Sequence, residues 1–281
     1  MNYIKIKSHA KINLALNVIS KASSLHRIES IIAFVSLHDE IFVKKIKSKK
    51  HSISFHGKFS RNIPRDNTIY KLLKILEKKK LLNNIKFKIK INKRIPNKAG
   101  LGGGSMNAAN LLKYLIKKKI INASNKKITE VCKLIGSDVI LGLNSTSSIL
   151  KSNDSLKYFP NNKKIYTLIA KPSFGCSTKY IYSRVKKFDK PQFNRPSKQM
   201  FNFKFIKKLK NSLEPIALSR YPQLRKIKLD LEKLTNLGFV RMTGSGSAFV
   251  AYFQSKETCD YAKKQFNKKY KNYWCIASKT I

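Results

Sequence analysis

The sequence predicts an α+β fold in two lobes, and three observations support this expectation. Strand-like runs of alternating or continuous apolar residues recur along the chain and are interleaved with segments of helical periodicity. Several of these runs are separated by turns short enough for hairpins. The chain has 281 residues, 42% of them apolar, which is enough for one large domain or two smaller ones. We expect an N-terminal domain over residues 1–150 and a C-terminal domain over residues 151–281.

The first half is expected to begin with strands and to continue with helices. Apolar patterns predict strands over residues 3–7, 10–18, 29–35, 40–46, 52–55 and 85–91. Helical periodicity predicts helices over residues 68–76, 106–119 and 129–135. Asp66, Asn67 and Thr68 are typical of a helix start, and Gly136 is typical of a helix end.

The second half continues the mixture of strands and helices. Strands are expected over residues 147–151, 158–159, 165–171, 238–242, 248–253 and 274–278. Helices are expected over residues 221–237 and 259–270, and a loop over residues 172–179. Residues 186–203 are rich in Pro, Lys and Asn and are expected to be irregular. Residues 211–215 open a stretch that is expected to pack against the functional site.

A glycine-rich run in the first half is the main functional signal. Gly100, Gly102, Gly103 and Gly104 are followed by Ser105 and then by an apolar helical pattern. A helix start leaves backbone N–H groups without partners and carries partial positive charge, and glycine lets a bulky anion approach. The run therefore predicts a phosphate-binding turn, in which Ser105 caps the helix or contacts a phosphate or its metal.

Two common phosphate-binding patterns are excluded. No Lys–Ser/Thr pair follows the glycines, as a P-loop would require. The spacing also differs from the dinucleotide fingerprint, and no acidic residue closes a second strand about twenty residues further on. A tight turn that needs positive φ, without any ligand, is the alternative interpretation of the run.

The charge balance suggests a second class of function. The chain has 60 Lys and Arg residues against 14 Asp and Glu, which gives a net charge of +46. Such a balance is typical of proteins that bind nucleic acid. The lysines, however, are spread along the chain without a basic stripe or tail, and Lys, Asn and Ile are abundant together. AT-rich codons explain this excess without a specific nucleic-acid partner, although the charge would still attract phosphorylated substrates.

Other features favour a cytoplasmic protein. The four cysteines are scattered without metal-ligand spacing, which favours free thiols in a reducing compartment. No run of about 18 apolar residues is present, so we expect neither a transmembrane helix nor a membrane partner. The first residues alternate like a strand and do not resemble a signal peptide.

Four strings, in this order along the chain, resemble the GHMP kinase superfamily, which includes galactokinase, homoserine kinase and mevalonate kinase. They are AKINLALNV from Ala10, the glycine run, IGSDVILGL from Ile135 and VRMTGSGSAFVAYF from Val240. The resemblance spans almost the whole chain. It implies the two-lobed GHMP kinase fold, with a ribosomal-protein-like N-terminal lobe and a ferredoxin-like C-terminal lobe. It also implies transfer of a phosphoryl group from ATP to an alcohol.

The resemblance implies a catalytic pair, Lys11 and Asp138. Asp138, in the string IGSDV, would be the general base for the acceptor hydroxyl. Lys11, in the string AKINL, would favour the ionised form of that carboxylate and stabilise the negative charge that develops. The alternatives are an ordinary helix N-cap for Asp138 and one more surface lysine for Lys11.

The resemblance also implies where ATP binds. The nucleotide would lie along Pro96, Asn97, Lys98, Ala99, Gly100, Leu101, Gly102, Gly103, Gly104, Ser105 and Met106. Gly244, Ser245 and Gly246 would form a second glycine turn that closes the same cleft, with a simple hairpin as the alternative. Mg²⁺ is expected with ATP, because the metal neutralises phosphate charge. No set of carboxylates with metal-ligand spacing is present, so Ser105 and the phosphates would hold it.

The resemblance also implies the identity of the acceptor. AKINL, His26, the triple glycine and the chain length resemble the branch that phosphorylates the 2-hydroxyl of 4-diphosphocytidyl-2-C-methyl-D-erythritol in non-mevalonate isoprenoid biosynthesis. His26 would contact the cytosine, and Asn13 and Thr178 would line the acceptor pocket. The family usually has Asp-Gly-Tyr-His, but here Leu25 precedes His26, which removes an aromatic stacking platform.

Three functions therefore remain as alternatives. The first is the kinase of the cytidine-diphosphate alcohol, acting as a monomer or weak homodimer on a small-molecule substrate. The second is another GHMP kinase of the homoserine or mevalonate type, which the change at Leu25 slightly favours. The third is a basic nucleic-acid-binding protein on a kinase-like scaffold, for which a steep salt dependence of binding would be the sign.

Overall fold

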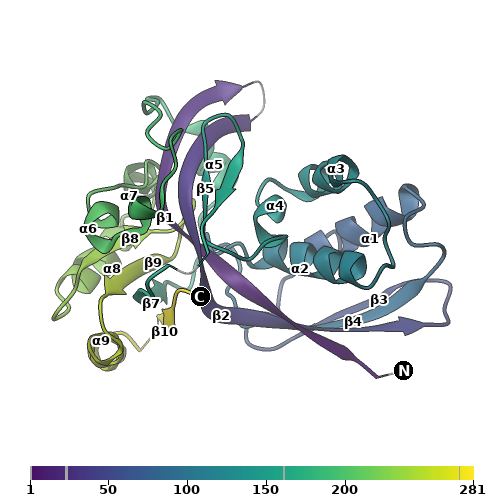
Figure 1. Cartoon of the computed structure of the whole chain (residues 1–281). Helices are drawn as coiled ribbons and strands as arrows, with labels where there is room; N and C mark the ends of the chain where they lie inside the picture. The colour runs from purple at the N-terminus through teal and green to yellow at the C-terminus, as the bar shows by residue number, and fades with distance from the viewer. Residues whose placement is uncertain (1, 23–24, 161, 272) are drawn as a thin grey trace. The chain divides into compact units, whose positions relative to one another are not determined.

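The computed structural model describes residues 2–22, 25–160, 162–271 and 273–281 (Figure 1). The chain forms two compact units, each assembled from separate stretches of sequence. The first unit contains Met1–Ala10, Leu37–Asn97 and Gly102–Ser145, and the second contains Lys11–Ser36, Lys98–Leu101 and Thr146–Ile281. Both units contain strands and helices, so the expectation of an α+β fold is confirmed.

Two long paired strands replace the four short strands expected at the N-terminus. They are β1 (Ile4–Ala22) and β2 (Leu25–Ile46). Polar residues interrupt the apolar pattern of both strands, so the sequence predicted strand ends at positions where the strands in fact continue. Ser8 Oγ accepts a hydrogen bond from Asn110 Nδ2 at 3.5 Å, and Ser36 Oγ bonds Ser278 Oγ at 2.8 Å. Because these hydroxyls find partners within their own units, both strands continue through the polar positions.

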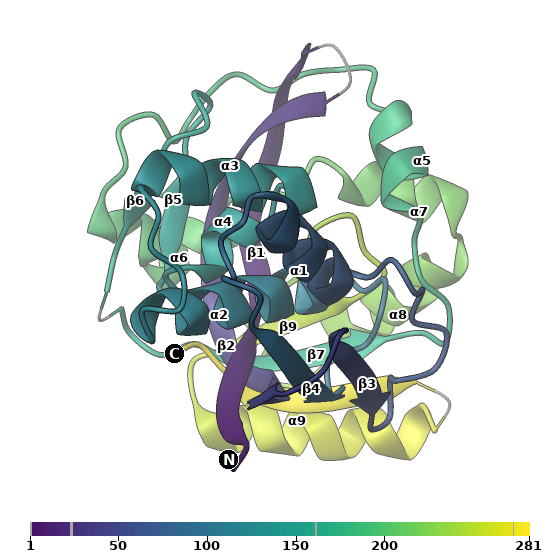
Figure 2. The same cartoon turned by 90° about the vertical axis from the view of Figure 1, so that its right-hand side faces the viewer.

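The first unit contains a small sheet covered on one face by helices (Figures 1 and 2). Strand β4 (Lys86–Asn92) pairs antiparallel with β2 and parallel with β3 (Ser52–His56). The helices are α1 (Thr68–Lys78), α2 (Gly103–Lys117), α3 (Asn125–Ile135) and α4 (Val139–Gly142). Their apolar faces pack with buried strand residues such as Phe87, Ile89 and Ile91.

Helix caps explain where the helices of this unit begin. Asn67 Oδ1 accepts from the N–H groups of Ile69 and Tyr70, both at 3.1 Å, so α1 begins where its capping residues predicted. Helix α3 begins at residue 125, four residues earlier than expected, because Ser124 Oγ accepts from the Lys127 N–H. It ends at Gly136, as the sequence predicted.

The second unit contains a four-stranded antiparallel sheet in the order β10-β7-β9-β8. These strands are β7 (Tyr166–Lys171), β8 (Phe239–Met242), β9 (Phe249–Phe253) and β10 (Trp274–Lys279). Helices α8 (Gln223–Glu232) and α9 (Lys256–Lys269) pack against it through one apolar cluster. Near β2, the short strands β5 (Ser148–Leu150) and β6 (Leu156–Tyr158) add a hairpin.

The remaining elements of the second unit are α5 (Thr178–Ser183), the 3₁₀ turn η1 (Lys198–Phe201), α6 (Phe203–Lys207) and α7 (Glu214–Arg220). Three helices of this unit, α5, α8 and α9, correct expectations. Helix α5 begins inside the segment expected to be a loop, because Ser177 Oγ caps it by accepting from the Tyr180 N–H. Helix α8 is shorter than expected, and Asn236 beyond its end has a φ of 54°. Helix α9 begins earlier, at the cap Ser255.

Across the part of the chain that the structure describes, no helix combines the length and the apolar content needed to span a bilayer.

Candidate active site

The glycine run forms the start of α2. Gly102 is the N-cap with a φ of 69°, and it offers no side chain to the first turn. The Met106 N–H donates to the Gly102 carbonyl at 2.8 Å and makes the first bond of the helix. The N–H groups of Gly103, Gly104 and Ser105 come before it and, as at any helix start, have no acceptor within the helix. No acidic side chain lies in this turn. The start of α2 therefore has the donors and the dipole that favour an anion.

The helix begins three residues earlier than residue 106, where the sequence predicted its start, and this changes the role of Ser105. Gly103 and Gly104 lower helix propensity, which is why the pattern pointed to a later start, but the first turn tolerates them. Gly102 holds the N-cap position, so Ser105 is the third residue of the helix and not its cap. Contact of its hydroxyl with a phosphate or a metal stays a prediction.

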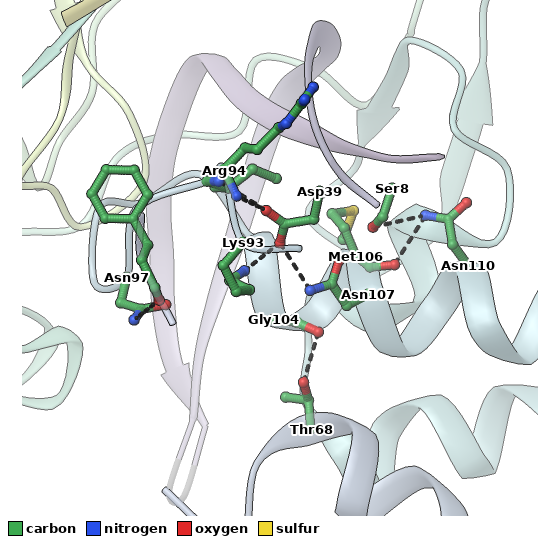
Figure 3. Close-up of polar contacts among 12 residues, drawn as sticks. Ser8, Asp39, Thr68, Lys93, Arg94, Asn97, Gly104, Met106, Asn107 and Asn110 are labelled. Atoms are coloured by element: carbon green, nitrogen blue, oxygen red, sulfur yellow. Dashed lines mark hydrogen bonds and ion pairs between the residues drawn. The ribbon is translucent and has the colours of Figure 1, made fainter. Parts of the chain in front are cut away.

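Other parts of the first unit pack closely around this helix start (Figure 3). Thr68 Oγ1, in the first turn of α1, donates to the Gly104 carbonyl at 2.7 Å, so the N-termini of α1 and α2 lie side by side. A Cβ on Gly103 would lie 3.0 Å from Ile95 Cγ2 and 3.3 Å from Lys93 Nζ. The absence of a side chain at Gly103 is therefore a packing requirement of this helix start.

Asp138 lies at the N-terminus of α4 in the same unit. It is half-buried and occupies the N-cap position, but its carboxylate makes no capping hydrogen bond. The capping role that was the alternative for Asp138 is therefore not what the structure shows. Helix α4 packs tightly on α2, since a Cβ on Gly142 would lie 2.6 Å from Ala109 Cβ and 3.0 Å from Met106 Sδ. This contact fixes α4 on the helix that carries the glycine run.

Lys11 lies on β1 in the second unit and is only 4% exposed, so it is not a surface lysine. Its Nζ donates to Asn13 Oδ1 at 2.8 Å. The Asn13 side chain in turn donates to Ser30 Oγ at 2.8 Å, and Ser30 Oγ donates to the Ala15 carbonyl at 2.5 Å. This chain of hydrogen bonds orients a buried ammonium group. A lysine exposed to solvent would not need such a network.

The second glycine turn connects β8 and β9, which pair as a hairpin, and it packs against residues 98–101. Gly100 has a φ of 75°, and a Cβ there would lie 2.0 Å from the Thr243 carbonyl oxygen. Gly244 has a φ of 55°, and its Cβ would lie 3.0 Å from the Gly100 carbonyl oxygen. The Ala248 N–H donates to the Ala99 carbonyl at 3.2 Å. The turn is thus a hairpin that also holds part of the glycine run.

We predict that Gly100→Ala lowers the free energy of unfolding by more than about 2 kcal/mol, because it adds a backbone clash to a left-handed φ. Urea unfolding followed by circular dichroism measures this. Gly136→Ala is the matched control, since its φ of 165° is extended and the nearest atom to a Cβ is 4.0 Å away. Equal stability of the two variants would contradict the packing described for the glycine turns.

Asn211 is a buried residue of this site that sequence reasoning did not single out, although its segment was expected to pack near the site. Its Nδ2 donates to the carbonyls of Met242 and Gly244, both at 2.8 Å, and thereby holds the turn from both sides. Thr178 Oγ1 and Ser245 Oγ are hydrogen-bonded at 2.8 Å, which brings an expected acceptor residue to the turn. The composition of the 211–215 segment gave no sign of these particular bonds.

His26 lies beside two aromatic side chains of the same unit. Its ring centroid is 5.3 Å from that of Tyr182 in α5 and 6.4 Å from that of Phe188. Burial, with a smaller contribution from Lys21, lowers the pKa of His26 from 6.5, so the ring is neutral at pH 7 and offers one donor and one acceptor. Residues 23–24, where the string departs from the family pattern, lie outside the described residues.

A metal would find few protein ligands here. Over residues 2–22, 25–160, 162–271 and 273–281, no group of three His, Cys, Asp or Glu side chains is placed to hold a metal ion. Mg²⁺ accepts such a setting, because it keeps water and phosphate oxygens as ligands and needs only one or two from the protein. Binding of the metal by Ser105 stays a prediction.

Known proteins resemble the chain over its whole length. The family model described as the GHMP kinases N terminal domain matches residues 67–149. The 4-diphosphocytidyl-2-C-methyl-D-erythritol kinase of Pelagibacter ubique is 56% identical over 281 residues, covering 100% of both chains. The kinase of the same name from Persephonella marina is 34% identical and covers 88% of this chain and 90% of the relative. The one from Clostridium tetani is 30% identical and covers 99% of this chain and 100% of the relative.

Solved structures agree on the fold. A crystal structure of 4-(cytidine 5'-diphospho)-2C-methyl-D-erythritol kinase is similar with a TM-score of 0.78 and 23% identity, covering 99% of this chain and 100% of that one. Homoserine kinase from Cytophaga hutchinsonii has a TM-score of 0.70 and 16% identity, covering 100% and 95%. The resemblance inferred from the four strings is confirmed: the chain belongs to the GHMP kinase superfamily and, within it, to the 4-diphosphocytidyl-2-C-methyl-D-erythritol kinases.

Proposed function

We propose that the chain transfers the γ-phosphoryl group of ATP to the 2-hydroxyl of 4-diphosphocytidyl-2-C-methyl-D-erythritol in non-mevalonate isoprenoid biosynthesis. The full-length relatives of that name support the reaction. The observation in the chain itself that carries the proposal is the start of α2, where a glycine N-cap leaves the first turn open to phosphate. GHMP kinases use ATP as the phosphoryl donor, and this start is where its phosphates would bind.

The residues that would hold ATP are Pro96 to Met106, the segment that contains the glycine run. Backbone N–H groups of Gly103, Gly104 and Ser105 would donate to phosphate oxygens. Mg²⁺, when bound with ATP, would neutralise phosphate charge, with Ser105 Oγ and phosphate oxygens as its ligands. The high positive charge of the chain would raise the rate of encounter with the anionic substrates.

The transfer itself needs one base and one cation. Asp138 would take the proton of the 2-hydroxyl as its oxygen forms a bond to the γ-phosphorus. The bond between the γ-phosphorus and the bridging oxygen would break at the same time, and ADP would leave with that electron pair. Lys11, held by Asn13, would stabilise the negative charge that develops on the reacting oxygens.

The acceptor would bind within the second unit. His26 is neutral at pH 7, so it suits the uncharged edge of cytosine, and Asn13 and Thr178 would contact the rest of the acceptor. Phe188 is 48% exposed and lies with Tyr182 beside His26. An exposed ring at this place would supply the stacking surface that the missing tyrosine gives other family members.

We predict that Phe188→Ala raises KM for the cytidine-diphosphate alcohol by about fivefold, because one stacking contact with a base is lost. KM for ATP is expected to stay within about twofold of the original value. Steady-state kinetics with each substrate varied in turn measure both constants. Phe205→Ala, which removes another exposed phenylalanine of the second unit, is the control. An unchanged acceptor KM in Phe188→Ala would exclude Phe188 from the acceptor site.

An ADP-release assay with three acceptors tests the proposed function. Turnover with the cytidine-diphosphate alcohol, and little with homoserine or mevalonate, is the expected result. Preference for homoserine or mevalonate would move the chain to another branch of the superfamily. Inactivity with all three, together with nucleic-acid binding that weakens steeply with salt, would favour the nucleic-acid alternative.

We also propose a cytoplasmic enzyme, a monomer or weak homodimer, that requires no membrane or specific nucleic acid. The free cysteines and the small-molecule substrate of its relatives support this setting.

A further inference from the structure

Asp39 is a fully buried carboxylate in the first unit that the mechanism above does not use. It lies on β2, and its side chain is 0% exposed. Its Oδ1 accepts from the backbone N–H groups of Arg94 at 2.7 Å and Ile95 at 2.8 Å. Its Oδ2 accepts from Asn107 Nδ2 at 2.9 Å and from Lys93 Nζ (Figure 3). Four donors from two other segments of the unit thus meet at one carboxylate.

The donors flank the segment Pro96–Met106, which contains the glycine run. Arg94 and Ile95 lie just after β4, where the chain enters the run, and Asn107 lies in α2, where the chain has left it. One carboxylate therefore fixes both ends of the phosphate-binding segment. Asn107 Oδ1 is buried without a hydrogen-bond partner among the described residues, so the bond to Asp39 is what orients this amide.

Lys93 completes the network as the counter-ion of Asp39. Its side chain is 4% exposed, and its Nζ would lie 3.3 Å from a Cβ on Gly103. A negative charge buried near a phosphate site would oppose the binding of ATP, but here an ammonium group neutralises it. The lysine thus allows a carboxylate to hold the run without repelling the ligand.

We propose that Asp39 is a positioning residue for ATP: it holds the entry to the glycine run and the start of α2 at the separation at which the first-turn N–H groups converge on phosphate. This inference rests on the proposed binding of ATP at the start of α2. Asp39 does not touch the nucleotide and acts through the backbone of residues 94–95 and through Asn107.

The first test removes the hydrogen bond between Asn107 and Asp39 and leaves the Asp39–Lys93 ion pair in place. Asn107→Leu removes the bond to α2 and keeps the branched shape of the side chain, although leucine is bulkier. Asn110→Leu is the matched control, because Asn110 is also a buried asparagine of α2 but bonds Ser8 and the Met106 carbonyl, not Asp39. We expect Asn107→Leu to raise KM for ATP by about fivefold or more and to leave the acceptor KM within about twofold. Asn110→Leu should leave both KM values near the original.

A charge-free network supplies the second test. Asp39→Asn alone leaves Lys93 buried without its counter-ion, so weaker ATP binding is expected together with a lower Tm. Asp39→Asn with Lys93→Met keeps an oxygen for the N–H groups of residues 94–95 and, once the Asn107 amide flips, a donor for Asn107 Oδ1. We expect this double variant to recover most of the ATP affinity and Tm of the original protein.

Direct binding of a non-hydrolysable ATP analogue, measured by calorimetry without acceptor, separates this inference from the proposed reaction. Weaker binding by Asn107→Leu than by Asn110→Leu would support the positioning role even if the acceptor proved to be another alcohol. Equal affinities in these two variants, or a KM for ATP and a KM for acceptor that rise together, would overturn it. Failure of the original protein to bind the analogue would overturn both this inference and the proposed function.

Discussion

Asp138→Asn is expected to lower kcat by about 10³-fold and to leave the affinity for an ATP analogue nearly unchanged. The amide has the shape of the carboxylate but cannot accept the proton of the 2-hydroxyl. The carboxylate makes no capping bond to α4, so the substitution removes no cap from this helix. ADP release under saturating substrates measures kcat, and calorimetry measures the affinity.

The control for this variant is Asp154→Asn, which changes an exposed aspartate in a turn with a φ of 62°. Asparagine tolerates this left-handed conformation well, so activity and Tm should both be retained. If Asp138→Asn kept kcat within about tenfold of the original, Asp138 could not be the base. Loss of nucleotide affinity in parallel with kcat would instead indicate that the substitution disturbs the glycine run through α4 and α2.

The start of α2 illustrates what could be predicted from sequence. Its signal is local, because glycines followed by an apolar helical pattern define a turn and a helix without reference to the rest of the chain. The start was placed three residues too late, since glycine propensity argues against a helix that in fact begins at Gly103, and the end was placed two residues too late. The cap at Asn67 and the end at Gly136 were predictable for the same local reason.

The network around Asp39 illustrates what could not be predicted. Its partners Ile95 and Asn107 are 56 and 68 positions away in sequence, and an aspartate inside a strand pattern reads as a break. Only tertiary contacts show that the charge is satisfied and that β2 continues through it. Lys93 lies three residues before Pro96, and nothing in the sequence distinguished this buried lysine from the many exposed ones.

The acceptor side depended on tertiary structure in the same way. The sequence shows that a tyrosine is missing before His26, but not that Tyr182 and Phe188 lie beside the imidazole. Helix α5, which carries Tyr182, was not predicted, because a six-residue helix is too short to show periodicity. The string around His26 could not identify the stacking partner of the base, because the aromatic neighbours of His26 lie far along the chain.

Lys11→Met is the second variant with a large expected effect, a decrease of kcat by about 10²-fold with a smaller change in KM for ATP. The substitution keeps most of the side-chain volume but removes the ammonium group that would stabilise the transferring phosphoryl group. It also leaves Asn13 Oδ1 without its donor, which should cost about 1–3 kcal/mol of stability. Kinetics and urea unfolding measure these two effects separately.

Lys7→Met is the matched control, because Lys7 lies on the same strand β1 but is exposed to solvent. It should retain both kcat and stability, as surface substitutions usually do. Lys11→Arg keeps the charge with a different shape, so partial recovery of kcat would separate the role of charge from that of packing. A Lys11→Met variant with normal kcat and reduced stability would show that the buried ammonium group supports the strand and not the reaction.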